Sequence, residues 1–199
     1  MKKNDRIWEL DALRGICILC VILIHLIFDL IYFIGLDLHL PAWYVFVQQY
    51  GGVIFVVLSG CCATLGSRSF RRGCIVFSCG MLISLVTVGM YRLGMASRNV
   101  IVWFGVLHLL ASCMLLFGLT RKLWEALPAW VLPVLCLALI FLTAPCADGV
   151  TTQTPHLWLF GFTTPDFASA DYFPLLPWFF VFLLGTWAGR YVKAGRLPQ

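Results

Sequence analysis

The sequence predicts an all-α protein, a polytopic membrane bundle of about six transmembrane helices. Of its 199 residues, 61% are hydrophobic and 12% are charged, about half the charged share of an average soluble domain. The mean hydropathy is +0.93. The hydrophobic residues also gather in runs, most of them long enough to cross about 30 Å of hydrocarbon as a helix. Together these observations exclude an ordinary soluble domain.

Six hydrophobic runs give the expected order of the helices. The first follows a basic start that imitates a signal peptide, but its apolar run of about twenty residues is too long and no cleavage site follows, so we expect a retained helix. The fifth run is the shortest, at the lower limit for a span. No repeat or low-complexity linker interrupts the series, so residues 1–199 are expected to form a single integral-membrane domain. The predicted helices cover residues 14–34, 44–66, 73–91, 100–118, 128–144 and 174–191.

The basic residues predict the orientation of the bundle. Cytoplasmic loops of membrane proteins carry an excess of Lys and Arg. If the six helices alternate in direction, all but two of the 14 Lys and Arg lie on the side of the N-terminus, and the exceptions are Arg92 and Arg98. Both termini are therefore predicted to be cytoplasmic. The residues on the N-terminal side are Lys2, Lys3, Arg6, Arg14, Arg68, Arg71, Arg72, Arg121, Lys122, Arg190, Lys193 and Arg196.

Neither the net charge of +5 nor the nine cysteines indicate a further class of function. The basic residues stand in short clusters between apolar runs, with no aromatic residues interleaved, which does not indicate nucleic-acid binding. All the cysteines except Cys146 lie in or beside apolar runs, where Cys behaves as a small hydrophobic residue. Cys17 and Cys20 have the spacing of a metal or redox pair, but no second such pair follows, and we expect neither a metal site nor a disulfide framework.

Ionisable residues inside the predicted helices are the candidates for catalysis. His25 and Asp29 lie one turn apart in the first helix, where an Asp costs about 2.5–3.5 kcal/mol on insertion scales. His108 is expected at similar depth in the fourth helix, and His39 in the loop that follows the first. A histidine oriented by a carboxylate is a general base near neutral pH. The alternatives are a hydrogen bond between helices for His108 and a simply exposed His39.

A second group of candidates lies on the predicted cytoplasmic side. Asp11 and Arg14 suit an ion pair at a helix start, but Arg14 and Gly15 equally suit contact with a phosphate. Arg71 and Arg72, with Arg68 beside them, either signal topology or attract an anionic cofactor. On the opposite side, Arg92 and Arg98 either reach the bilayer surface or bind an anionic group.

The long predicted loop between the fifth and sixth helices, about residues 145–173, contains no Lys or Arg. Its length exceeds that of ordinary connections and is typical of lids and binding loops. It carries Asp148, Asp166 and Asp171. These carboxylates suit an acceptor that bears amines or hydroxyls.

Five motifs follow one another in the order found in a known family. They are R-I-W-E-L-D-A-L-R-G-I with I-H-L-I-F-D-L in the first helix, F-V-V-L-S-G-C at 55–61, F-R-R-G at 70–73, V-W-F-G-V-L-H at 102–108 and D-Y-F-P-L-L-P-W at 171–178. On these motifs the chain resembles the bacterial membrane proteins related to the catalytic domain of heparan-α-glucosaminide N-acetyltransferase.

The resemblance implies a multi-pass acyltransferase of the bacterial inner membrane. It would take acetyl-CoA, or another acyl-CoA, on the cytoplasmic side, use no metal, and pass the acyl group to a saccharide or similar acceptor outside. Asp11, Arg14, Gly15, Arg71 and Arg72 become the cofactor-binding candidates. The acceptor-binding candidates are Asp171, Tyr172, Trp178 and Arg92.

The resemblance leaves the catalytic base open between two histidines. A histidine past the first helix and an asparagine within it are implicated in the lysosomal enzyme. By its spacing from L-D-A-L-R-G, His25 falls at the place of the asparagine, and His39 is the nearest candidate for the histidine. The lysosomal enzyme also has more helices, which leaves room for a site completed in a homo-oligomer.

Two other functions fit the same residues. A small proton-coupled transporter would use His25, Asp29 and His108 as a relay, although the chain lacks the inverted repeat common in transporters. A non-catalytic membrane subunit would use the same polar groups only to hold its helices together.

Overall fold

The computed structural model describes residues 7–32, 34–37, 39–154 and 156–194. Lys2, Lys3, Arg6 and Arg196, four of the residues that predict the orientation, lie outside this part of the chain.

Six α-helices make up most of the described chain. Short 3₁₀ helices cover Arg98–Val100, Ala144–Ala147 and Leu157–Phe160, and two-residue strands β1 (Val150–Thr151) and β2 (Phe162–Thr163) pair in parallel. The α-helices are α1 (Trp8–Tyr32), α2 (Ala42–Leu65), α3 (Ser69–Arg92), α4 (Val106–Ala126), α5 (Val131–Thr143) and α6 (Leu175–Ala194).

Four of these helices, α1, α3, α4 and α6, are long and apolar enough to cross a membrane. The α2 helix is a fifth candidate, since Ala42–Gln48 and Tyr50–Leu65 pass together but are bent by 41°. The α5 helix is apolar but shorter than a span, even with the 3₁₀ turn that extends it to Ala147. The expectation of a helical membrane protein is therefore confirmed, whereas the described helices give four or five spans by length instead of six.

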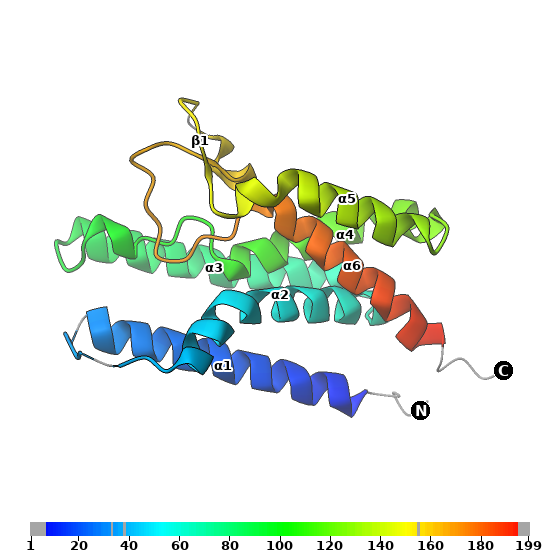
Figure 1. Ribbon diagram of the computed structural model, residues 1–199, viewed down its shortest axis with the longest axis horizontal. Helices are drawn as coiled ribbons and strands as arrows, with labels where there is room; N and C mark the ends of the chain where they lie inside the picture. The colour runs from blue at the N-terminus through cyan, green and yellow to red at the C-terminus, as the bar shows by residue number, and fades with distance from the viewer. Residues whose placement is uncertain (1–6, 33, 38, 155, 195–199) are drawn as a thin grey trace.

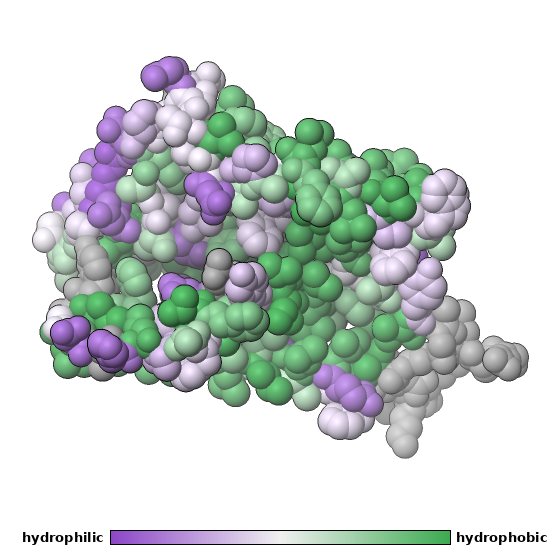
Figure 2. All heavy atoms as spheres, in the orientation of Figure 1, coloured by the Kyte–Doolittle hydropathy of each residue, from purple (hydrophilic) through white to green (hydrophobic). Residues whose placement is uncertain are grey.

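The helices run back and forth along the long axis of the molecule, and the chain enters and leaves at the same end (Figure 1). We call this the terminal end. The opposite end, the loop end, holds the connections after α1, between α3 and α4, and between α5 and α6. Hydrophobic side chains cover the middle of the visible face, and hydrophilic ones gather over the long connection at the loop end (Figure 2). This arrangement suits a bilayer crossed along the long axis.

The start of α4 differs from the prediction. The fourth helix was expected over 100–118 but begins at Val106, because the preceding apolar residues are extended and buried against the long loop. The amide of Ala170 donates to the carbonyl of Ile101 (3.0 Å), and the amide of Phe173 donates to that of Phe104 (2.9 Å). Hydrophobicity alone does not distinguish such a segment from a helix. His108 is consequently the third residue of α4, close to the loop end, and not nine residues inside a helix.

The contact between α2 and α6 brings two backbones together at glycines. A Cβ at Gly60 would lie 2.1 Å from the carbonyl oxygen of Phe182, and one at Gly185 would lie 2.0 Å from that of Val57. Small residues allow such close approach of membrane helices. Phe182 and Leu183 are fully buried beside this contact. The core of the protein therefore lies around α2 and α6.

Two arginines fasten the helix ends at the terminal end. Arg121 donates to the carbonyls of Gly66 (2.9 Å) and Thr64 (3.1 Å) at the end of α2, and pairs with Glu125 at 2.8 Å. Arg190 of α6 donates to the carbonyls of Trp124 and Leu127. Cations at helix C-termini also complement the helix dipole. Two of the residues that predict orientation thus satisfy backbone groups as well.

The α1 helix is the least buried of the candidate spans. None of the residues in its most apolar window is buried. It lies beside α2 (Figure 1), where the Tyr44 hydroxyl reaches the carbonyl of Ile24 at 3.5 Å. Its polar residues His25 and Asp29 are both exposed. The rest of the described chain therefore covers α1 on one side only.

Replacing Gly185 with Ala should destabilise the protein, because the added methyl group would meet the Val57 carbonyl at 2.0 Å. We expect a loss of about 1–3 kcal/mol, as for other overpacked cores, which lowers the unfolding temperature by about 2–4 °C per kcal/mol in a chain of this length. Thermal unfolding in detergent measures the effect.

The matched control is Gly89→Ala in α3, where a Cβ would meet nothing within 4 Å. This variant should keep or raise the unfolding temperature, because Ala is favoured over Gly in a helix by roughly 0.5–1 kcal/mol. Equal effects of the two substitutions would contradict the close packing of α2 and α6.

Candidate active site

The carboxylate of Asp171 is fixed at the start of α4. The amide of Val106, the first residue of that helix, donates to its Oδ2 at 2.8 Å. Gly105 makes room for the carboxylate, since a Cβ there would lie 2.1 Å from the same oxygen. The other oxygen, Oδ1, accepts no hydrogen bond from the described part of the chain. The N-terminus of a helix favours a negative charge, so Asp171 is held with one oxygen engaged and one free.

Two histidines lie within electrostatic reach of Asp171. Burial raises the pKa of the Asp171 carboxyl above its ordinary value, while the amide of Val106, His25 and His108 act in the opposite direction. His25 comes from α1 and His108 from α4, so charges on two separate helices act on Asp171 without a hydrogen bond or ion pair joining either histidine to its carboxylate in the described chain.

Asp29 and His39 are not part of this group. Both are exposed, and among the described residues neither contributes to the electrostatic surroundings of Asp171. The choice between His25 and His39 as the base stays a prediction, but the structure gives His25 a nearby carboxylate from another element.

His108 is buried, with 3% of its surface exposed, and both of its ring nitrogens have hydrogen-bond partners. The amide of Gly105 donates to Nδ1 at 3.3 Å, and Nε2 lies 3.2 Å from the Ser84 hydroxyl of α3. The sequence pointed to neither Gly105 nor Ser84. Gly105 stands three residues before His108 in the motif V-W-F-G-V-L-H, and this position was the signal that could have indicated it. Ser84 carried no such signal, because small polar residues are common in membrane helices.

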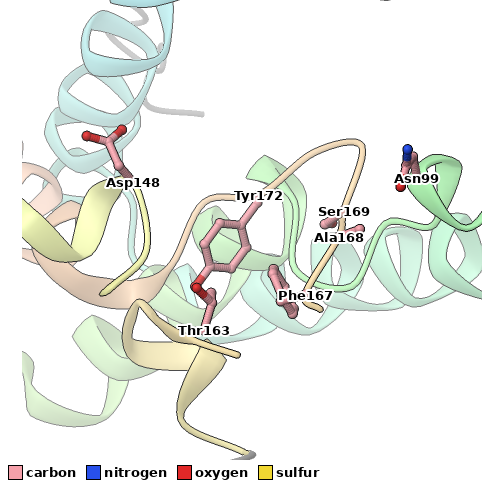
Figure 3. A pocket seen from close by; sticks show the side chains of 7 residues that line it. All are labelled: Asn99, Asp148, Thr163, Phe167, Ala168, Ser169 and Tyr172. Atoms are coloured by element: carbon pink, nitrogen blue, oxygen red, sulfur yellow. The ribbon is translucent and has the colours of Figure 1, made fainter. Parts of the chain in front are cut away.

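A cavity of about 310 Å³ opens at the loop end and is lined in part by Ser169 and Tyr172, which lie on either side of Asp171 in the sequence. Tyr172, Phe167 and Thr163 lie together in its wall, whereas Asp148 and Asn99 stand at its two ends (Figure 3). Ala168 and Ser169 complete the lining. Aromatic faces beside hydroxyl, amide and carboxylate groups suit a small polar ligand.

The Tyr172 hydroxyl is fixed, because it donates to the carbonyl of Trp158 at 2.5 Å. Burial, followed by the nearby Cys146, raises the pKa of Tyr172 to about 12. The phenol therefore stays protonated at neutral pH and contributes a ring face to the cavity, not a base.

Trp178, another expected residue, carries an unpaired donor. Trp178 lies two residues after Leu176, whose non-helical backbone interrupts α6. The centroid of its ring is 5.3 Å from that of the Phe173 ring. Its indole Nε1 is buried without a hydrogen-bond partner among the described residues. Buried donors in native proteins usually have partners, so an acceptor from a bound molecule would satisfy this one.

Arginines form a second cavity at the terminal end. It has a volume of about 600 Å³ and is lined by Ser67, Arg68, Arg71, Arg72 and Ile75. In the described chain the single ion pair joins Arg121 to Glu125, so no acidic side chain neutralises these three arginines.

Arg14 lies on the same side of the molecule, in contact with the Cys62 thiol. Asp11 and Arg72 are within electrostatic range of that thiol. The expected ion pair between Asp11 and Arg14 is not present in the described structure, and Nε of Arg14 is buried without a partner. A Cβ at Gly15 would meet nothing within 4 Å, so its backbone is accessible from the side. The unpartnered Nε of Arg14 and the accessible backbone of Gly15 favour the alternative in which Arg14 contacts a ligand.

Arg92 is the last residue of α3, at the loop end, and is exposed, as is Arg98. In the described chain neither forms an ion pair. Arg92 is thus on the expected side, without a contact that joins it to Asp171. No group of three or more His, Cys, Asp or Glu that could hold a metal ion occurs among the described residues.

A helical membrane protein with a buried carboxylate near histidines at one end and, in its described part, a cavity of arginines at the other has the layout of a transmembrane enzyme. Residues 6–198 match the family described as heparan-alpha-glucosaminide N-acetyltransferase, catalytic, and the chain belongs to this family. The family resemblance drawn from the five motifs is confirmed. At the level of the family, the activity is that of a transmembrane acetyltransferase.

No curated protein and no solved structure matches the chain.

The raised pKa of Asp171 predicts how its replacement by Asn depends on pH. Its folded-state pKa lies above the unfolded value of about 3.9, so the stability that it contributes is fully present below that value and is lost as pH rises through the folded pKa. Relative to Asp171→Asn, the wild type should therefore lose unfolding temperature as pH rises above about 4. Thermal unfolding of both proteins across this range measures the difference, with Asp166→Asn in the exposed loop as control. A difference that is constant with pH would contradict the burial of Asp171.

Proposed function

We propose that the protein is an acetyltransferase that takes acetyl-CoA at the terminal end and transfers its acetyl group to an amine or hydroxyl of a saccharide-like acceptor at the loop end. The observation that carries this proposal is the Asp171 carboxylate, fixed by the amide of Val106 and within electrostatic reach of His25. The membership of the family supports the same activity.

The arginine cavity is the proposed site of the donor. CoA carries several phosphate charges, and arginines bind phosphate oxygens with charge-assisted hydrogen bonds. Arg71 and Arg72 line the cavity, with the expected ligand residue Arg14 nearby, and Arg68 adds a further cation. His25 follows Arg14 by eleven positions in α1, which is about 16 Å along a helix. The flexible thiol arm of CoA would extend over this distance toward the loop end.

His25 is the proposed general base. As the acceptor nitrogen or oxygen attacks the thioester carbonyl, the imidazole of His25 takes the acceptor's proton, the C–S bond breaks, and CoA leaves as a thiolate. Asp171, with Oδ1 free, stabilises the imidazolium that forms. In a two-step variant the imidazole itself attacks, CoA leaves, and the acceptor then removes the acetyl group from the acyl-histidine. In both the one-step and the two-step route, the CoA thiolate finally receives the proton that the acceptor's amine or hydroxyl has lost.

The cavity at the loop end and the unpaired indole of Trp178 are the proposed contacts of the acceptor. The terminal end, with the arginines, faces the cytoplasm, and the protein resides in the inner membrane of a bacterium as a single domain. A purified protein that neither binds acetyl-CoA nor releases CoA with any amino sugar would refute this function, and solute uptake into proteoliposomes would favour a transporter instead.

Removing a cation from the arginine cavity should weaken binding of acetyl-CoA. For Arg71→Gln and Arg72→Gln we expect a roughly 10- to 100-fold higher Kd, since a hydrogen bond to a charged group contributes about 1.5–3 kcal/mol. Calorimetric titration of the detergent-solubilised protein with acetyl-CoA measures the change. The control is Arg98→Gln, at the opposite end, which should leave the Kd as it is. Unchanged binding in both cavity variants would place the donor elsewhere.

Replacement of His25 with Ala should abolish turnover without affecting donor binding. Loss of a general base lowers kcat by about 10²–10⁴-fold, whereas the Kd of acetyl-CoA should be unchanged because the arginines remain. Release of CoA with glucosamine as acceptor measures the rate.

His39→Ala is the matched comparison, and His156→Ala in the exposed loop is the control. If His39→Ala abolished turnover while His25→Ala retained it, the base would be His39.

A further inference from the structure

The imidazole of His108 is held from several sides. A Cβ at Gly80 of α3 would lie 3.1–3.2 Å from three carbons of the ring, so the ring packs directly on the backbone of that helix. The rings of Phe77 and Phe104 flank it, with centroids at 5.9 and 5.6 Å. A ring packed in this way has one orientation, and the identity of its hydrogen-bond partners then decides its protonation.

The directions of the hydrogen bonds define a single tautomer. The amide of Gly105 can only donate, so Nδ1 of His108, at 3.3 Å, carries no proton. The Ser84 hydroxyl has one proton and donates it to the carbonyl of Val102 at 2.7 Å, since that oxygen can only accept. Toward Nε2 at 3.2 Å, Ser84 is therefore the acceptor, and Nε2 carries the proton. The ring is neutral, with both nitrogens engaged.

A ring in this state lacks a free lone pair with which to take a proton from an acceptor. The hydrogen-bond partners of the His108 ring indicate a structural role instead. Through Gly105 it fixes the residue directly before α4, and through Ser84 it joins that segment to α3, where the Thr87 hydroxyl also accepts from the amide of Val102 at 3.2 Å. The amide of Val106, next to Gly105, is the donor that holds Asp171.

We propose that His108 is a positioning residue, a neutral hydrogen-bonded lock that holds the start of α4 so that Asp171 stands opposite His25. This inference rests on the proposed function and assigns His108 a role other than acid–base catalysis. The segment 101–104, directly before Gly105, also binds the chain on both sides of Asp171. The carbonyl of Ile101 accepts from the amide of Ala170, and that of Phe104 accepts from the amide of Phe173. His108 is thus linked to the carboxylate through two neighbouring backbone amides, since that of Gly105 donates to His108 and that of Val106 donates to Asp171.

Two variants distinguish a lock from a base. In His108→Asn the side-chain oxygen occupies the place of Nδ1 and still accepts from Gly105, although it has no basic nitrogen. In His108→Ala the amide of Gly105 loses its acceptor. If His108 is a lock, kcat should fall roughly 10- to 100-fold in the Ala variant and recover most of this loss in the Asn variant, with the Kd of acetyl-CoA unchanged in both. Equal loss of kcat in the two variants would show that a basic nitrogen is required and would overturn the proposal.

A second measurement needs no turnover. The chain has four histidines, so ¹⁵N NMR of the full-length protein with labelled imidazoles can assign His108 as the signal that the Asn variant lacks. We expect the neutral form protonated on Nε2, with and without acetyl-CoA. A proton on Nδ1 would overturn the lock.

The two readouts keep the proposals apart. If the wild type transferred no acetyl group at all, the proposed function would fail, and the tautomer would still decide whether His108 is a lock.

Discussion

The close approach of α2 and α6 is the constraint on which the arrangement of the site depends. At Gly60 and Gly185 each helix lies against the other's carbonyl oxygens, and the hydroxyl of Thr64 donates to the carbonyl of Thr186 at 3.0 Å. Helices in a bilayer gain little from hydrophobic burial against each other, so backbone proximity and hydrogen bonds carry much of their association. The segment before α6 runs over the start of α4, where the amides of Ala170 and Phe173 donate to the carbonyls of Ile101 and Phe104 and the amide of Val106 donates to Asp171.

The two ends of the molecule use charge differently. At the terminal end some arginines satisfy helix carbonyls, as Arg121 does at the end of α2, while others line a cavity without acidic partners. At the loop end the important charge is one carboxylate, held by a backbone amide and partly shielded from water. In the proposed function, the first arrangement attracts the anionic donor and the second takes the acceptor's proton.

Much of the fold followed from the sequence, because hydrophobic runs are local signals. Six helices were expected and six α-helices are found in the described chain, with α5 too short to span. The start of α4 was wrong by six residues, since Ile101 and Phe104 are apolar for a tertiary reason, their burial against the loop that carries Asp171. For the same reason the sequence could name His108 and Asp171 as candidates but could not find Ser84 and Gly105. Their importance lies in contacts between segments that are distant along the chain.

The surroundings of Asp171 support the proposal that it, and not Asp29, is the partner of His25. Asp29 lies one turn beyond His25 on the same helix, and both side chains are exposed, so nothing in the described structure holds their relative positions. Asp171 comes from another element and has one oxygen fixed by the amide of Val106. Electrostatic stabilisation in an enzyme depends on groups that are already in place before charge develops. A carboxylate held by α4 meets that condition, whereas a neighbour on the sparsely packed α1 helix does not. The same helix places Arg14 within electrostatic range of the Cys62 thiol, as Arg72 of the arginine cavity is, so a shift of α1 along its axis would move His25 relative to Asp171 and Arg14 relative to Arg72 at the same time.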